Sequence, residues 1–171
     1  MRVFAVAFAL WSVVARAETQ VTVSPLTLLE VGKVAGCGLS SSANMPEASA
    51  VGEVIAFREG DVTAFAVRAR TSPEAGTVTG VRLTTASYDT AAIFPAPQLL
   101  PGGIIETRKI LERFAGSSFA QELMVMGGRF EITFGHGQPL AYDLPRPMPH
   151  NVRQAYLNCA GDLFRPEDEG R

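Results

Sequence analysis

Residues 61–70 read DVTAFAVRAR, and this stretch decides the fold class. Its side chains would alternate between the two faces of an extended segment, with Val62, Ala64 and Ala66 on one face and Thr63, Phe65, Val67 and Ala69 on the other. A strand with apolar residues on both faces is typical of the centre of a sheet. Residues 77–87 resume strand character after a turn that contains Pro73 and Gly76, so we expect the two runs to pair as an antiparallel hairpin.

The chain before this stretch gives weaker signals. Residues 19–23 alternate polar with β-branched side chains and predict a first strand, whereas residues 25–38 are apolar without a clear period and stay unassigned. Residues 40–44 have the composition of a loop. Asn44 as a cap and Pro46 in the first turn would then open a short helix toward Ile55.

Residues 94–103 contain three prolines and two glycines, which exclude a regular internal strand or helix. The next segment, residues 104–114, has an apolar stripe opposite a charged face and predicts an amphipathic helix. In the alternative, Pro101-Gly102-Gly103 is a tight turn that pairs residues 99–100 with residues 104–105.

Two glycine-containing turns follow. Gly127-Gly128 separates the apolar runs 122–126 and 130–134 and predicts a hairpin, with Met124 and Met126 on one face of its first strand. Gly135-His136-Gly137 would turn the chain into a further strand over residues 139–144, so that three consecutive strands form a meander. For the two methionines, packing in the core is favoured over a role in an adaptable binding surface.

The last element is a helix with an apolar stripe, formed by Val152, Ala155, Tyr156, Cys159 and Leu163, and with Asn151 or His150 as its cap. Cys159 therefore points at the body of the domain, and Cys37 lies between two glycines that leave room for close approach. We expect these two cysteines, which are the only ones in the chain, to form a disulfide. The alternative is two buried free thiols.

Together these segments predict an α+β fold: an antiparallel sheet of about five to seven strands, one helix after the proline-rich segment, and a terminal helix packed on the sheet. An all-β sandwich with a helical appendage is the alternative.

The ends of the chain differ from its middle. Arg2, the apolar run that follows it and Ala15-Arg16-Ala17 have the order of a bacterial signal peptide over residues 1–17. That run is shorter than the roughly twenty residues of a spanning helix, so no membrane span is expected. A single globular domain would occupy residues 18–164, and residues 165–171 form a polar tail. Export to the periplasm or the medium would also provide the oxidising compartment that a disulfide requires.

Few residues of the sequence indicate a catalytic, metal-binding or cofactor-binding site. The chain lacks the nucleophile elbow, the phosphate loop and the zinc-protease motif, and no spacing indicates a metal or a cofactor. His136 and His150 are the only imidazoles, and Asp143 could approach either, which makes these three residues weak catalytic candidates. Each histidine also fits an exposed turn or a helix cap.

A candidate partner-docking loop is carried by Phe94, Leu99 and Leu100, which lie in an apolar, proline-rich stretch. The same stretch could instead cover the edge of the sheet. The net charge of −2 at pH 7 argues against nucleic acid as a partner.

The sequence thus favours an exported binding or envelope-associated protein without a catalytic site, stabilised by one disulfide. Its partner would be another envelope protein or a small ligand. A small periplasmic hydrolase that uses His136 or His150 is the alternative.

We expect export to remove residues 1–17, with cleavage between Ala17 and Glu18, because Ala15 and Ala17 are the small residues that a signal peptidase reads. Intact-mass measurement of the protein from the periplasm or medium tests this. Recovery there of a chain that still begins at Met1 would contradict it.

Overall fold

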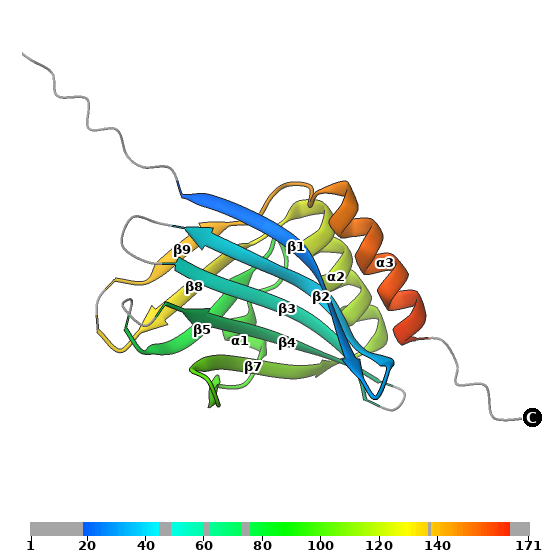
Figure 1. The fold of residues 1–171 in the computed structure, drawn as a ribbon, viewed down its shortest axis with the longest axis horizontal. Helices are drawn as coiled ribbons and strands as arrows, with labels where there is room; N and C mark the ends of the chain where they lie inside the picture. The colour runs from blue at the N-terminus through cyan, green and yellow to red at the C-terminus, as the bar shows by residue number, and fades with distance from the viewer. Residues whose placement is uncertain (1–18, 45–48, 60–61, 73–75, 137, 165–171) are drawn as a thin grey trace, which may run out of the picture.

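The computed structural model describes residues 19–44, 49–59, 62–72, 76–136 and 138–164. The expected α+β class and the terminal helix are confirmed, but the strands divide between two antiparallel sheets (Figure 1). In the large sheet the order is β1 (Gln20–Glu30), β2 (Lys33–Asn44), β3 (Ser49–Glu59), β4 (Val62–Thr71), β7 (Ile104–Leu111) and β6 (Gln98–Leu100). The small sheet has the order β5 (Val78–Thr84), β8 (Arg129–Phe134) and β9 (Leu140–Asp143).

Strand β4 has the position that its two apolar faces predict, because it lies inside the large sheet and Ala66 and Val67 are both fully buried. Its expected hairpin partner was wrong. β4 pairs with β3 and β7. β5 belongs to the small sheet, where it pairs with β8. The proline and glycine of the predicted turn indicate a change of chain direction, but they do not specify with which strand the next segment pairs.

The short helix expected from Asn44 toward Ile55 and the loop expected at residues 40–44 were also wrong. Residues 40–44 belong to β2 and residues 49–55 to β3, and the two strands pair in register from Gly36↔Phe57 to Asn44↔Ser49. Residues 45–48, which include Pro46, lie outside the described residues. The previously unassigned residues 25–38 complete the strands β1 and β2. Tertiary pairing overrides the turn preference of serine, asparagine and glycine here.

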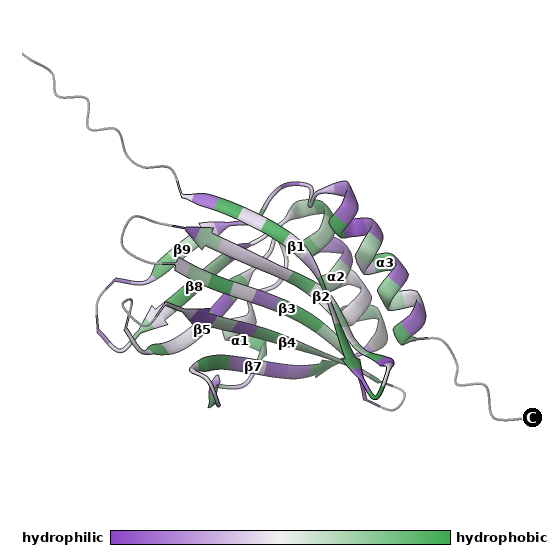
Figure 2. Ribbon diagram, in the orientation of Figure 1, coloured by the Kyte–Doolittle hydropathy of each residue, from purple (hydrophilic) through white to green (hydrophobic). Residues whose placement is uncertain are grey.

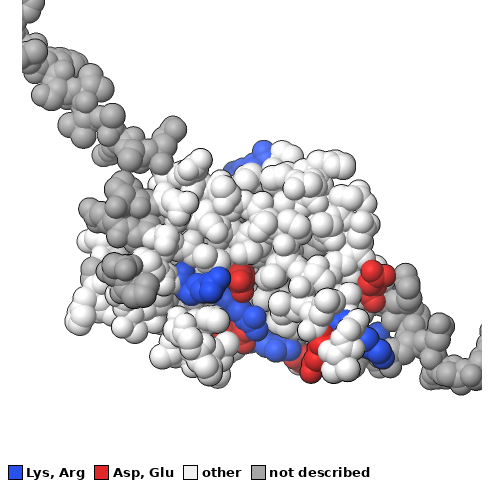
Figure 3. Space-filling view, viewed as in Figure 1, with Lys and Arg blue, Asp and Glu red and all other residues white. Residues whose placement is uncertain are grey.

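Residues 104–111 form strand β7 and not the expected helix. The alternative is confirmed, because Leu99 pairs with Ile105 and Leu100 with Ile104 across a turn in which Gly102 and Gly103 have φ of 81° and 73°. The charges of β7 meet partners on other strands of the large sheet: Glu106 binds Arg68 on β4, and Arg108 binds Glu59 on β3. A band of mixed basic and acidic side chains crosses this face of the molecule (Figure 3).

The first strand of the expected 122–134 hairpin is instead the end of helix α2 (Arg113–Met126). Gly127 ends the helix at φ 66°, and a Cβ there would lie 2.6 Å from the carbonyl oxygen of Pro145. The strands expected after it are confirmed as β8 and β9, which pair with each other. The third strand of that sheet is β5, so the consecutive meander was wrong.

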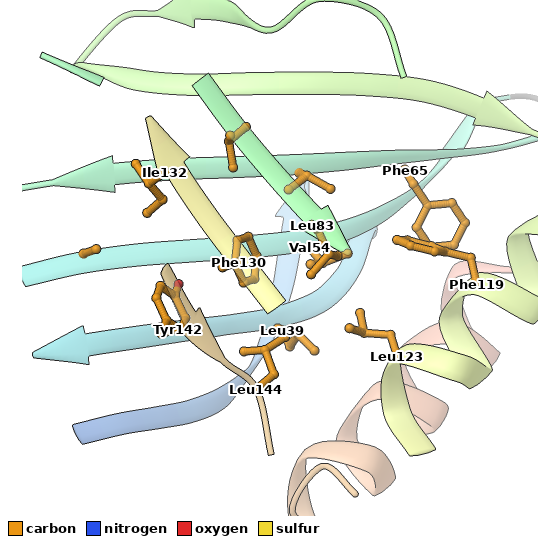
Figure 4. Close-up of a cluster of buried hydrophobic side chains, with 14 of the residues drawn as sticks. Leu39, Val54, Phe65, Leu83, Phe119, Leu123, Phe130, Ile132, Tyr142 and Leu144 are labelled. Atoms are coloured by element: carbon orange, nitrogen blue, oxygen red, sulfur yellow. The ribbon is translucent and has the colours of Figure 1, made fainter. Parts of the chain in front are cut away.

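The large sheet is covered on one face by two different layers (Figure 1). The small sheet lies behind one part of it, α2 and α3 (His150–Leu163) lie behind the other, and the short helix α1 (Thr90–Ile93) contacts β5. Apolar side chains from these layers meet in one core, with Phe119 of α2 and Phe130 of β8 fully buried in it (Figure 4). Apolar and polar residues are mixed along the strands that face the viewer (Figure 2).

Helix α3 packs against β1 and β2, and its apolar stripe is confirmed, with Val152, Cys159 and Leu163 buried. The expected cap was wrong: Pro149 precedes the helix, and no side chain caps it. The expected disulfide is present between Cys37 and Cys159, whose Cα atoms are 5.7 Å apart. Within the described residues, no helix has both the length and the hydropathy needed to cross a membrane.

Reduction of this disulfide is expected to lower the free energy of unfolding by up to about 5 kcal/mol, because the bond spans 122 residues and restricts the unfolded chain. Urea unfolding with and without dithiothreitol measures the effect. The double variant Cys37→Ser/Cys159→Ser should resemble the reduced protein and should not respond to dithiothreitol. An unchanged midpoint for the reduced wild-type protein would contradict the expectation.

Candidate functional site

A groove of about 860 Å³ lies between α2, α3 and the adjacent ends of β3 and β4. Strands contribute Arg58, Val62, Thr63 and Phe65, helix α2 contributes Gly116, Ser117, Ala120, Gln121, Met124 and Val125, and the third wall consists of Arg153, Tyr156, Leu157, Ala160 and Phe164.

The two helices that form the groove run antiparallel (Figure 1). The backbone N–H of Met148, just before α3, donates to the carbonyl oxygen of Met124 at 3.1 Å, so the end of α2 lies beside the start of α3. Arg153, in the first turn of α3, and Met124 therefore share one end of the groove. Phe164 lies at the opposite end, toward the start of α2.

The floor of the groove depends on a close contact between β4 and α2. The rings of Phe65 and Phe119 meet edge to face with their centroids 5.2 Å apart, which fixes the helix over the sheet. A Cβ on Gly116 would lie 3.1 Å from the Phe65 ring, so a residue without a side chain lets α2 approach the strand here.

The groove exposes an unusual amount of apolar side chain. Val62, Val125, Leu157 and Phe164 all line it, with relative exposures of 43, 49, 64 and 43%. Apolar residues that gather around a hollow, in place of being scattered singly over a surface, are typical of a binding site.

The polar groups of the groove are few and of one charge sign. Arg58 and Arg153 are its charged residues, and no aspartate or glutamate lines it in the described part of the chain. The Nε atom of Arg153 is buried and has no hydrogen-bond partner among the residues that the structure describes. Tyr156 adds a phenol that is largely enclosed, and this burial raises its pKa to about 12.

The catalytic candidates of the sequence do not lie in this groove. His136 is exposed in the turn after β8, and His150 is exposed at the start of α3. Asp143 forms an ion pair with Arg129, with 3.1 Å between its Oδ1 and the Arg129 Nη1. Among the described residues, no hydrogen bond or ion pair joins Asp143 to either histidine.

The candidate docking loop is divided between the core and the sheet edge. Phe94 is buried, and its ring centroid lies 6.4 Å from that of Phe119. Leu99 is 63% exposed on the edge strand β6, and Leu100 beside it is half-buried. Of the three, Leu99 is the residue with most surface for a partner.

Sequence reasoning missed the groove because it assigned residues 122–126 to a strand. A signal for the helix was present: Phe119, Ala120, Leu123 and Met124 recur at helical spacing, and all four are buried. Met124 does line the groove, but it does so from a helix.

Comparison of the chain with protein-family models, curated proteins and solved structures gave no match in any of the three.

Two tyrosines are expected to ionise only near pH 12, because burial raises the pKa of both Tyr142 and Tyr156 to about that value. Ultraviolet absorbance of tyrosinate during a pH titration measures this. The variant Tyr156→Phe should lose one of the late-titrating groups. In denaturant all tyrosines should titrate near pH 10. Ionisation of Tyr156 near pH 10 in the folded protein would show that the groove leaves its hydroxyl in water.

Proposed function

We propose that this chain is an exported binding protein, periplasmic or secreted, whose groove between α2 and α3 holds a small ligand with a largely apolar body. The observation that carries the proposal is the apolar lining of the groove, which leaves large side chains such as Leu157 and Phe164 in contact with solvent. Its volume of about 860 Å³ lies within the range of about 300–1,000 Å³ that is typical of small-molecule sites.

Two observations support export. The order of charged, apolar and small residues in residues 1–17 is that of a signal peptide. A disulfide that joins strand β2 to helix α3 is stable in an oxidising compartment and rare in a reducing one.

Binding without catalysis has more support than hydrolysis. Among the described residues, those that line the groove include a serine, a threonine, a glutamine and a tyrosine, but neither histidine and no carboxylate that could act as a general base. His136 and His150 are exposed elsewhere, and Asp143 forms an ion pair with Arg129.

The proposal is tested by titrating the purified protein with phenylnaphthylamine, a neutral fluorophore whose emission rises in apolar surroundings. Saturable binding is expected. The variant Ala160→Phe places a ring in the groove and should weaken binding by about ten-fold or more, which corresponds to about 1.4 kcal/mol.

The matched control is Asn158→Phe, which places the same ring on an exposed position of α3 that does not line the groove. It should bind the fluorophore as the wild-type protein does. Equal affinities for wild type and Ala160→Phe, or no saturable binding at all, would overturn the proposal.

A further inference from the structure

We propose that the ligand of this groove is an amphiphile with a single anionic headgroup, which Arg153 binds at the end where α3 begins, while the apolar part lies along the helices toward Phe164. This inference rests on the proposed function and specifies the ligand of the same site.

The Arg153 side chain is the first reason. The residue lines the groove, and its Nε atom is buried and has no acceptor among the described residues. A buried donor without a partner is rare and destabilising in folded proteins, and an arginine accepts a planar or tetrahedral anion through several N–H groups at once. An oxyanion in the groove would satisfy this donor and the charge together.

The position of Arg153 within α3 is the second reason. The N-terminal end of a helix carries a partial positive charge, which favours acidic residues in the first turn. The first turn of α3 has no acidic residue, and no side chain caps it. It carries Arg153 instead. The partial positive charge of the helix end and the charge of the guanidinium therefore lie close together, and the first turn supplies no acidic residue to offset them. An anion bound at Arg153 would be stabilised by both.

The charge distribution of the groove favours one headgroup at this end. Arg58 lies opposite Thr63 in the register of β3 and β4, next to the connection between these strands. This end of the groove is remote from the start of α3. Between the two ends the groove is lined by Ala120, Leu157 and Ala160 among others, and none of the described residues that line it is acidic and would repel an anion.

The length of the apolar part follows from the helix. Arg153 and Phe164 are eleven residues apart along α3, which corresponds to about 16 Å. An extended alkyl chain of medium length can cover this distance. The chemistry that fits is therefore a carboxylate or a phosphate monoester on an unbranched hydrocarbon tail.

Displacement of phenylnaphthylamine by ligands that share a dodecyl chain tests the headgroup. Dodecanoate and dodecyl phosphate, which distinguish a carboxylate from a phosphate, are compared with neutral dodecanol and cationic dodecyltrimethylammonium, all below their micelle concentrations. We expect at least one of the anions to displace the fluorophore at about ten-fold lower concentration than dodecanol, and the cation to be the weakest.

Variants assign the preference to a residue. Arg153→Gln should reduce the displacement by the better anion to the level of dodecanol, when each ligand is compared with the fluorophore affinity measured for the same variant. Arg153→Lys, which keeps the charge, should retain part of the preference. Arg129→Gln is the control for net charge, because Arg129 lies on β8 and does not line the groove. It should leave the preference intact.

The outcomes separate the two proposals. Saturable fluorophore binding with no preference of either anion over dodecanol would overturn the headgroup inference alone. Loss of the preference in Arg129→Gln as well, or in Arg153→Lys as completely as in Arg153→Gln, would overturn the assignment to the Arg153 charge. Absence of fluorophore binding would overturn the proposed function.

Discussion

The close contact between Tyr142 and Gly52 is the constraint on which the two-layer arrangement depends. A Cβ at position 52 would lie 2.5 Å from the Tyr142 hydroxyl, so a glycine in β3 allows the small sheet to reach the large one. The same hydroxyl lies 3.0 Å from the Ser41 Oγ, and Ser41 in turn donates to the carbonyl oxygen of Gly52. These contacts satisfy the buried hydroxyls of Ser41 and Tyr142 and connect β2 and β3 of the large sheet with β9 of the small one, so they favour the arrangement in which the two sheets meet here.

The sequence predicted those features that depend on local pattern. The central strand β4, the terminal helix and the inward direction of Cys159 all follow from periodicity, and each is present. Strand pairing was predicted poorly, because the sequence of residues 77–87 does not indicate whether this strand pairs with β4 or with β8. Residues 104–111 show a further limit of prediction from sequence patterns. Their apolar positions fit a helical stripe, and it is the partners of Glu106 and Arg108 on other strands that distinguish a strand from a helix.

The groove itself could not be predicted, since its three walls come from segments far apart in the chain. The even number of cysteines predicted the disulfide, which is present between Cys37 and Cys159. The significance of Arg153 appears only when its Nε atom is found buried beside an apolar hollow. In the sequence it is one of thirteen arginines, with nothing to distinguish it.

The position of the disulfide has a consequence for the order in which the molecule is assembled. Cys159 is near the end of the chain, whereas its partner Cys37 is near the start. Because the chain is synthesised from its N-terminus, the strands of both sheets are complete before α3, the last wall of the groove, exists. The covalent link can close only after that wall is present. The groove is therefore the final part of the fold to be completed, and a chain that ended before α3 would have both sheets but only two of the three walls.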